Sequence, residues 1–435
     1  LLLADIVFNS YRGLFSSSHG RTYEGHKKYA MRESTSGVSY LITGMGNHRG
    51  GGMGPASLVL SERYRTPRVL MEIAHDYDRE VMLNRQRMGF RSDQGERWGL
   101  SFDNAEDGMH WLSMEAYTHP KMLSLLIDMF DQFNWWQNRF FEPFEPYRGF
   151  LYFCRRYGLL PIVAKAFEQD LTRNMRDEVN VYTYRTPDYM LSTAQDWRRG
   201  FGGDQQHIWQ ASLAPDAVCF TTHPVRPAPM SARSAGRTPN LWDGSGNLPR
   251  AAQVENVAIV IYHISTRTGL YITHDLLYTH AWLPKEQFDE IVEAEGWVFA
   301  RRGDGYLALR SQQPAHWQEE PGPDQQRRLI APGRRNIWIC ELGRRATDGE
   351  FTDFRQRILD APLHFETLQV TYESPSQGRL EFAWNGPLKQ NGETIPLGEY
   401  PRYDNPYTQT PFPADNVTLR HNDHWLELDW TTPRR

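Results

Sequence analysis

The chain has 435 residues, with 48 basic and 53 acidic side chains and a formal net charge of -5 at pH 7. This balance excludes the broad basic surface of a nucleic-acid-binding protein, so any attraction for an anionic ligand must be local. At this length, two domains with separate apolar cores are the default expectation.

Aromatic residues make up 13% of the chain, including 14 tryptophans and 21 tyrosines. Such a supply suits carbohydrate-binding clefts, in which aromatic faces cover sugar rings, although core packing uses the same residues. Cys154, Cys219 and Cys340 each lie in an apolar run without metal-ligand spacing. They are predicted to be buried, inert thiols.

No apolar run approaches the ~18 residues that a transmembrane helix needs. The chain begins at Leu1 without an initiator methionine or a basic segment followed by a cleavage site. This start does not resemble a signal peptide. We therefore expect an N-terminally truncated chain of a secreted or periplasmic protein, whose export signal is not in this chain.

Apolar residues recur at helical spacing through the first 180 residues. The predicted helices are Leu1–Tyr11, Arg68–Arg79, Asn104–Tyr117, Pro120–Trp136, Tyr147–Cys154 and Pro161–Phe167. A polar loop after the first helix carries His19, Arg21 and Tyr23. Repeated antiparallel helices of this length predict part of a toroid of helical hairpins.

A glycine-rich loop occupies residues 44–54 and contains Asn47, His48 and Arg49. Its six glycines let the backbone approach a ligand or move as a lid. It is not a phosphate-binding loop, because it lacks a Gly-Lys-Ser/Thr ending and a preceding strand. A solvated surface loop is the alternative interpretation.

The pattern changes from helical to alternating within the stretch Tyr182–Pro224. Its polar and aromatic groups are Tyr182, Tyr184, Arg185, Tyr189, Gln195, Arg198, Arg199, Gln205, Gln206, His207 and His223. A polar cluster at a domain junction is a common place for a ligand cleft. The alternative is that these residues only hold two domains together.

Short alternating runs follow this stretch and predict antiparallel strands. They are Ala217–Thr221, Val257–Tyr262, Leu270–Thr273, Trp297–Ala300, Tyr306–Leu309, Ile337–Glu341, Leu368–Tyr372, Leu380–Trp384, Val417–Arg420 and Trp425–Trp430. Helical patterns near Phe288–Val292 and Phe351–Leu359 interrupt them. The expected fold class is α+β and multidomain: a partial N-terminal α/α toroid in residues 1–180, then a large antiparallel β-sandwich in residues 181–435. A further boundary near residue 359 stays open.

This order of residues resembles the polysaccharide lyases of the heparinase II/III and alginate lyase type. In those enzymes an incomplete (α/α) toroid precedes a β-sandwich, an Asn-His pair neutralises the uronate carboxylate, and a toroid Tyr acts as base or acid. A sandwich His completes the site. The resemblance assigns the pair to Asn47 and His48, and the sandwich His to His207. The toroid Tyr is Tyr117, with Tyr77 and Tyr184 as alternatives.

The residue types suit β-elimination independently of the resemblance. Removal of a weakly acidic proton beside a carboxylate needs donors for the developing negative charge and a base with a suitable pKa. Because Tyr titrates near ~10, a Tyr base needs cationic or His neighbours. The arginines near Tyr184 and Tyr189 are candidates for that role.

The expected ligand is an acidic polysaccharide or oligosaccharide, with no nucleic-acid partner and no membrane span. The residues expected to bind it are His19, Arg21, Tyr23, Arg49, Arg185, Tyr189, Gln205 and Gln206. No dissociable cofactor is expected, and a structural divalent metal stays open. The 15 histidines show no HxH or HExxH spacing. His421 and His424 are interpreted as surface residues.

Two other functions remain open. A glycoside hydrolase would use paired carboxylates ~5 to 9.5 Å apart, and Glu106, Asp107 and Glu115 are the candidates. A solvated helix face is the alternative, and favoured, interpretation of those residues. A non-catalytic carbohydrate-binding protein would have the same aromatic content without needing Asn47, His48 and His207.

Overall fold

The computed structural model describes residues 2–9, 11, 65–88, 101–104, 107–108, 120–139, 142–171, 178–201, 208–214, 216–224, 246–265, 276–319 and 326–429. The chain divides into two compact units. Unit 1 comprises Leu1–Met88, Val179–Arg267 and Thr273–Arg435. Unit 2 is formed mainly by Gly89–Glu178.

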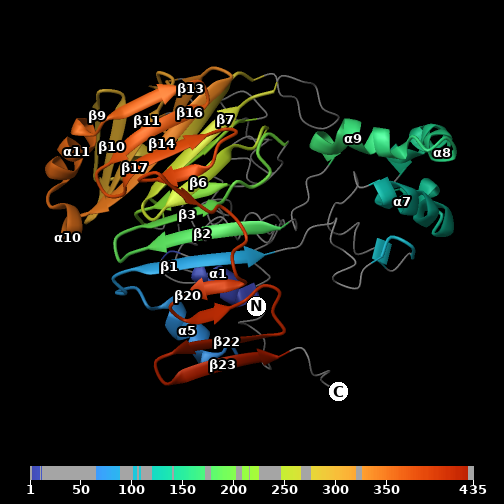
Figure 1. Ribbon diagram of the computed structural model, residues 1–435, viewed down its shortest axis with the longest axis horizontal. Helices are drawn as coiled ribbons and strands as arrows, with labels where there is room; N and C mark the ends of the chain where they lie inside the picture. The colour runs from blue at the N-terminus through green and yellow to red at the C-terminus, as the bar shows by residue number, and fades with distance from the viewer. Residues whose placement is uncertain are drawn as a thin grey trace. The chain divides into compact units, whose positions relative to one another are not determined.

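Unit 1 contains a ten-stranded antiparallel sheet, in which the central strands are neighbours in sequence. Its strands, in spatial order, are β12 (His316–Trp317), β13 (Arg328–Pro332), β8 (Tyr278–Trp282), β5 (Val218–Thr222), β4 (Trp209–Ser212), β3 (Met190–Ala194), β2 (Val179–Arg185), β1 (Met82–Met88), β20 (Tyr403–Asn405) and β21 (Thr408–Thr410). Figure 1 shows β1, β2 and β3 side by side in the middle of this unit.

Two smaller sheets and a hairpin complete the strands described in unit 1. The six-stranded sheet has the order β6 (Arg250–Val254), β7 (Val257–His263), β14 (Arg335–Arg344), β11 (Gly305–Ser311), β10 (Trp297–Arg302) and β9 (Glu290–Ala294). The five-stranded sheet has the order β15 (Leu363–Glu366), β16 (Gln369–Ser374), β17 (Gly378–Ala383), β18 (Leu388–Gln390) and β19 (Glu393–Ile395). The hairpin pairs β22 (Asn416–His421) with β23 (His424–Asp429).

The six-stranded sheet is buried on both faces, which explains the nearly continuous apolar sequence of β7 and β14. Val260 and Trp338 belong to the core shared with the ten-stranded sheet. Their neighbours Ile259 and Ile339 belong to a second core, shared with α11 (Phe351–Asp360) and the five-stranded sheet. Alternation along each strand therefore supplies two apolar layers, and the three sheets stack.

The ten-stranded sheet has an outer face, which is the one that points away from the six-stranded sheet. Part of it is covered by α1 (Leu2–Phe8) and α5 (Arg68–Ala74), whose apolar residues share a core with Phe220, Trp282 and Tyr403. Figure 1 shows both helices near β1 and β22. The short helix α10 (Arg345–Asp348) follows β14.

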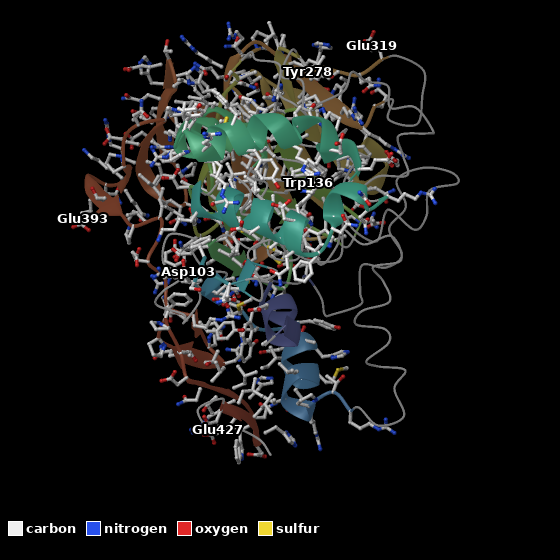
Figure 2. All side chains as sticks on the ribbon, turned by 90° about the vertical axis from the view of Figure 1, so that its right-hand side faces the viewer. Asp103, Trp136, Tyr278, Glu319, Glu393 and Glu427 are labelled. Atoms are coloured by element: carbon white, nitrogen blue, oxygen red, sulfur yellow. The ribbon has the colours of Figure 1, made fainter. Side chains whose placement is uncertain are left out.

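Unit 2 is helical in the residues described. It contains α7 (Pro120–Gln132), α8 (Arg148–Arg156) and α9 (Leu160–Leu171), with 3-10 turns η2 (Trp135–Gln137) and η3 (Glu142–Tyr147). Its core includes Ile127, Cys154 and Ala164, one from each helix. Trp136, which Figure 2 shows among these helices, packs on Phe130 at a ring separation of 4.6 Å.

The expected α/α toroid is wrong: the described residues form mostly antiparallel sheets and only short helices. Residues 68–74 are helical as predicted, but α5 packs with α1 and strands instead of with a ring of helices. Strand β1 was not predicted, because its buried residues Asn84 and Gln86 are polar and hide the alternation. Its pairing with β2 places residues 82–88 in the β-rich unit.

Most of the predicted strands that fall within the described residues are confirmed, as is the helix near Phe351–Leu359. The helix expected near Phe288–Val292 is wrong, because Glu290–Ala294 forms edge strand β9 beside β10. The three cysteines are free and buried, as predicted. Across the described ranges, no helix is long and apolar enough to cross a membrane.

Glu341 joins the six-stranded sheet to the five-stranded sheet and is 1% exposed. Its carboxylate accepts hydrogen bonds from the hydroxyls of Tyr372 at 2.6 Å, Ser374 at 3.0 Å and Ser376 at 2.8 Å. Burial raises the pKa of Glu341, against the opposing effect of these hydroxyl donors. The carboxylate is thus the acceptor for two buried hydroxyls, of Tyr372 and Ser374, and for the Ser376 hydroxyl at the exposed end of the group.

Substitution Glu341→Ala should lower the free energy of unfolding by about 3 kcal/mol, because it leaves a cavity and unsatisfied hydroxyls. Glu393→Ala is the matched control, since Glu393 is exposed and lies at the periphery in Figure 2. Its expected change is within about 0.5 kcal/mol. Urea denaturation measures both, and equal effects would contradict the role of Glu341.

Contacts between histidines and carboxylates join the β22–β23 hairpin to α5 and the residues that follow it. His424 Nδ1 lies 3.0 Å from Glu72 Oε2, and His421 Nε2 lies 3.8 Å from Asp76 Oδ2. Tyr407 donates to Asp76 at 2.7 Å. Both histidines are half-buried, so their interpretation as open surface residues is wrong.

Acid should loosen this attachment. Burial alone would raise the pKa of Asp76, but hydrogen bonds from Tyr407 and Arg79, with nearby positive charge, hold it below its ordinary value. The stability that it contributes is therefore present above pH ~4 and lost as the pH falls through the lower folded pKa.

Hydrogen exchange of the β22 and β23 amides, corrected for intrinsic rates, should therefore accelerate below pH ~4. The variant Asp76→Asn should already exchange faster than wild type at pH 7. Identical protection in the two proteins at both pH values would show that Asp76 does not hold the hairpin.

Candidate functional site

The stretch Tyr182–Pro224 supplies most of β2 and all of β3, β4 and β5. These are neighbouring strands in the middle of the ten-stranded sheet. The junction seen in the sequence is therefore the centre of one sheet. Its two faces separate the side chains that the sequence grouped together.

Tyr184 and Tyr189 pack on the core between the ten-stranded and six-stranded sheets. Their rings stack at 6.2 Å. Burial and the charge of Glu255 raise the pKa of Tyr184 to about 12, and burial raises that of Tyr189 well above its ordinary value. This environment is the opposite of the cationic one expected for a Tyr base.

Tyr182 lies near the turn between β6 and β7, where its hydroxyl accepts a hydrogen bond from the Glu255 backbone N–H at 3.3 Å. Burial raises the pKa of Tyr182 as well. The described tyrosines of β2 and the following turn are therefore structural groups with high pKa values.

Arg185 lies on the outer face, opposite Met82 in the β1–β2 register, and is 5% exposed. Its guanidinium donates to the Asp76 backbone carbonyl at 3.5 Å and is close to Tyr407. Arg185 therefore belongs to the polar contacts that attach α5 to the sheet. The structure does not bring it together with Tyr184.

Other residues of the stretch make packing contacts between sheets. Gln195 Oε1 accepts from the Gln253 backbone N–H at 3.1 Å. Arg199 donates to the Trp384 carbonyl at 2.5 Å. Arg198 makes a local contact, since it lies over the ring of its sequence neighbour Trp197 at 5.5 Å. These contacts fit the interpretation in which part of the junction only holds the protein together.

His223 directly follows β5 and is a buried histidine with both ring nitrogens engaged. Nδ1 accepts from the Asn247 backbone N–H at 2.8 Å, and Nε2 lies 2.8 Å from the Leu276 carbonyl. This pattern requires the neutral tautomer with the proton on Nε2. A Cβ on Gly246 would lie 2.5 Å from Nδ1, so this position needs glycine.

Several candidate residues lie outside the described part of the chain: His19, Arg21, Tyr23, Asn47, His48, Arg49, Glu106, Glu115, Tyr117, Gln205, Gln206 and His207. Asp107 is described, and its carboxylate accepts from the Ser101 backbone N–H at 2.6 Å and from the Asn104 amide at 3.1 Å. It therefore closes a local turn. Tyr77 is half-buried beside His75, at a ring separation of 5.5 Å.

A row of buried polar side chains crosses the outer face. Thr183 lies between Asn84 and Ser192 in the register of β1, β2 and β3, and Ser192 faces Gln210 of β4. All four are 0% exposed. Hydrogen-bonding groups thus occupy the place where an apolar layer would be expected.

The half of this row beneath α1 is a closed network. Asn9 donates to Gln86 Oε1 at 2.8 Å, and its own Oδ1 accepts from the Thr183 hydroxyl at 2.5 Å. Asn405 donates to Asn84 Oδ1 at 2.9 Å. Because its members satisfy one another, this half is best explained as the attachment of α1 to the sheet.

The other half differs, because buried polar atoms lack partners there. Gln210 donates to Ser212 at 3.0 Å, but its Oε1 has no hydrogen-bond partner in the structure as described. Among the described residues, the same holds for both ring nitrogens of His280 on β8 and for both amide atoms of Gln318 beside β13. His280 and Gln318 are both 0% exposed.

Such atoms are costly, because a buried polar group without a hydrogen bond loses about 1–3 kcal/mol. Native proteins contain few buried polar atoms without partners, and a bound ligand or an ordered water commonly explains each one. Gln210, His280 and Gln318, together with the buried Arg328, are therefore the candidate functional site.

The electrostatic surroundings of this site are positive. Burial, together with the positive charge of Arg328 and the nearness of the His223 ring, lowers the pKa of His280 well below its ordinary value. Its imidazole is therefore neutral at physiological pH and offers one donor and one acceptor nitrogen. In the ranges that the structure describes, no group of three or more His, Cys, Asp or Glu residues could hold a metal ion.

The motifs of the sequence do not include His280, Gln318 or Arg328. A signal is present in the segment YTHAW, Tyr278–Trp282, where a His interrupts a run that is otherwise aromatic, apolar or neutral. No sequence pattern around Gln318 or Arg328 predicts a functional role. The two residues come near His280 only through the pairing of β12, β13 and β8.

No protein-family model matches this sequence, and no curated protein matches it. A function must therefore be inferred from the residues and their arrangement.

The lowered pKa of His280 has a consequence for stability. The unfolded chain takes up a proton at this side chain below pH ~6.5, while the folded chain does not, so stability falls as the pH drops below that value. The contribution reaches at most about 1.4 kcal/mol per pH unit.

Urea unfolding of His280→Gln at pH 7.5 and 5.5 should show a smaller loss of stability between the two than wild type shows. His364→Gln is the control, since 72% of that side chain is exposed. An unchanged pH dependence in His280→Gln would mean that the imidazole is not held neutral.

Proposed function

We propose that this protein cleaves a uronate-containing polysaccharide by β-elimination, with the ligand on the outer face of the ten-stranded sheet. The supporting observation is that buried polar atoms of Gln210, His280 and Gln318 lack hydrogen-bond partners among the described residues, and that His280 and Gln318 flank the buried guanidinium of Arg328. Neutral amide and imidazole groups suit sugar hydroxyls, and a guanidinium suits a carboxylate. Together they favour an acidic carbohydrate over an apolar ligand.

The reaction class rests on the catalytic residues predicted from the sequence. His207 directly precedes Ile208, and the next residue begins β4, which carries Gln210. Asn47 and His48 remain the proposed donors for the uronate carboxylate, as in the lyases that the sequence resembles. Since an elimination needs both a base and stabilisation of the developing charge, this set of residues suits it.

The proposed proton-transferring residue is His207. Tyr184 is less suited, because the environment that raises its pKa to about 12 keeps its hydroxyl protonated at neutral pH. A hydrolase built on Asp107 is less supported, because its carboxylate already accepts local hydrogen bonds. A non-catalytic carbohydrate-binding protein would use the same polar face. Only an activity assay therefore distinguishes a lyase from a binding protein.

The decisive assay incubates the protein with a panel of uronate polysaccharides and follows both reducing ends and the ultraviolet absorbance of the unsaturated product. Elimination raises both signals, whereas hydrolysis raises only the first. Substitution His207→Ala should reduce turnover by about 10² to 10⁴ fold if it moves a proton. His364→Ala is the control and should leave turnover unchanged, because His364 is exposed.

Reducing ends without absorbance, abolished by Asp107→Asn but not by His207→Ala, would favour the hydrolase instead. Binding of the polysaccharide with neither signal would favour the non-catalytic protein.

A further inference from the structure

The apolar core between the six-stranded and five-stranded sheets ends in a polar and aromatic rim. Ile261 of β7 and Ile337 of β14 lie in this core. Because alternate residues of a strand share a face, His263 and Arg335 lie on the same side of the six-stranded sheet as the core. They also face each other in the strand register. Trp384 reaches this rim from the five-stranded sheet, since it directly follows β17 and packs on the same core.

Trp384 is the aromatic centre of the rim. Its ring meets the His263 ring edge to face, with the two centroids 5.6 Å apart. The Arg199 guanidinium lies 5.9 Å from the centroid of the Trp384 ring. Trp384 and His263 are half-buried, and Arg335 is exposed. Arg199, Trp384, His263 and Arg335 therefore form one surface group, the Trp384 cluster.

Arg250 fixes the backbone that carries Trp384. This arginine is 6% exposed, and its guanidinium donates to the carbonyls of Ala383 at 2.5 Å, Trp384 at 3.2 Å and Gly386. It also donates to both carboxylate oxygens of Asp196 at 2.9 Å. A ring held on such a backbone loses little conformational entropy when a ligand packs against it.

Positive charge accumulates on this rim. Arg250 occupies both oxygens of Asp196, and Arg199 comes only to within 3.9 Å of that carboxylate. Arg335 makes no ion pair with any residue that the structure describes. Arg335 therefore presents an exposed positive charge that no described carboxylate neutralises at close range, and such a charge attracts an anion.

His263 supplies a neutral hydrogen-bonding group beside Arg335. Burial, with the charges of Arg335 and Arg334, lowers the pKa of His263 below its ordinary value. Its imidazole is therefore neutral at physiological pH and has one donor and one acceptor nitrogen. Neither nitrogen has a hydrogen-bond partner within the described ranges.

The three groups of the rim have complementary uses in binding. An indole face packs against the C–H groups of a ring, a guanidinium binds both oxygens of a carboxylate, and a neutral imidazole donates to a hydroxyl. A pyranose that carries a carboxylate offers all three partners.

We propose that the Trp384 cluster is a non-catalytic surface site that binds a uronate segment of a polysaccharide. The sugar ring lies against Trp384, its carboxylate accepts from Arg335, and one of its hydroxyls accepts from His263. Naming the ligand a uronate rests on the proposed function, whereas the preference for an acidic sugar rests on these side chains. A polymer held at this second point, away from the outer face, stays at high local concentration.

Calorimetry with sodium hexagalacturonate and sodium hexamannuronate tests the site. The His207→Ala protein is used, so that the proposed elimination does not consume these probes. One of them should bind at least about 10-fold more tightly than the neutral control maltohexaose, the effect of one charge-assisted hydrogen bond. The NMR signals of the His263 ring, assigned with His263→Gln, should shift on binding. Equal binding of acidic and neutral probes, or no binding of either acidic probe, would overturn the site.

Charge reversal at Arg335 gives a second test. Because Arg335 is exposed, Arg335→Glu should keep the fold while its carboxylate repels the ligand. Binding of the acidic probe should weaken by at least about 10 fold. The matched control Arg420→Glu changes another exposed strand arginine, on β22, and should leave binding unchanged. Unweakened binding in Arg335→Glu would overturn the proposal.

The aromatic contact is tested by Trp384→Leu, with thermal unfolding to confirm that the variant is folded. Binding of the acidic probe should weaken, because the flat indole face is lost. Trp425→Leu is the control, since Trp425 is 66% exposed on β23. Equal effects of the two substitutions would contradict the role of Trp384.

These tests and the activity assay fail separately. Binding that Arg335→Glu weakens, in a protein without any eliminative cleavage, would support the surface site and contradict the lyase. Eliminative cleavage by a protein whose binding Arg335→Glu leaves unchanged would support the lyase and overturn the surface site.

Discussion

Burial of the six-stranded sheet on both faces is the constraint on which the rest of unit 1 depends. One layer of its side chains, with Val260 and Trp338, requires the ten-stranded sheet, and the other, with Ile259 and Ile339, requires α11 and the five-stranded sheet. Removing either cover would expose a continuous apolar surface. The six-stranded sheet therefore holds the other two sheets through two apolar cores, one on each of its faces, and Glu341 adds a polar contact to the five-stranded sheet.

The ten-stranded sheet consequently has one face committed to packing, and its polar side chains gather on the other. Beneath α1 those side chains satisfy one another through Asn9. Toward β8 and β13 they do not, since His280 and Gln318 have buried atoms without partners among the residues described. A fold that keeps such atoms sacrifices stability, as proteins do where they bind ligands. The half beneath α1 is therefore a structural network, and the half toward β8 and β13 is the candidate site.

The same alternation explains why adjacent residues of β2 have different roles. Tyr184 points into the interior, where burial raises its pKa, while Arg185 points to the outer face and contacts the α5 region. Their closeness in sequence suggested an activated Tyr beside an Arg. In a strand, successive side chains point to opposite faces, so neighbours in sequence are separated in space.

The sequence by itself determined the local elements: the short antiparallel strands, the stripe of α7, the helix α11 and the burial of Cys154, Cys219 and Cys340, because each follows from periodicity or hydropathy within a few residues. It could not show that β1 joins the sheet, since Asn84 and Gln86 look solvent-facing until α1 and β2 satisfy them. Nor could it bring Arg328 beside His280. Those outcomes depend on the register between strands distant in the chain, which only the tertiary packing of both sheet faces decides.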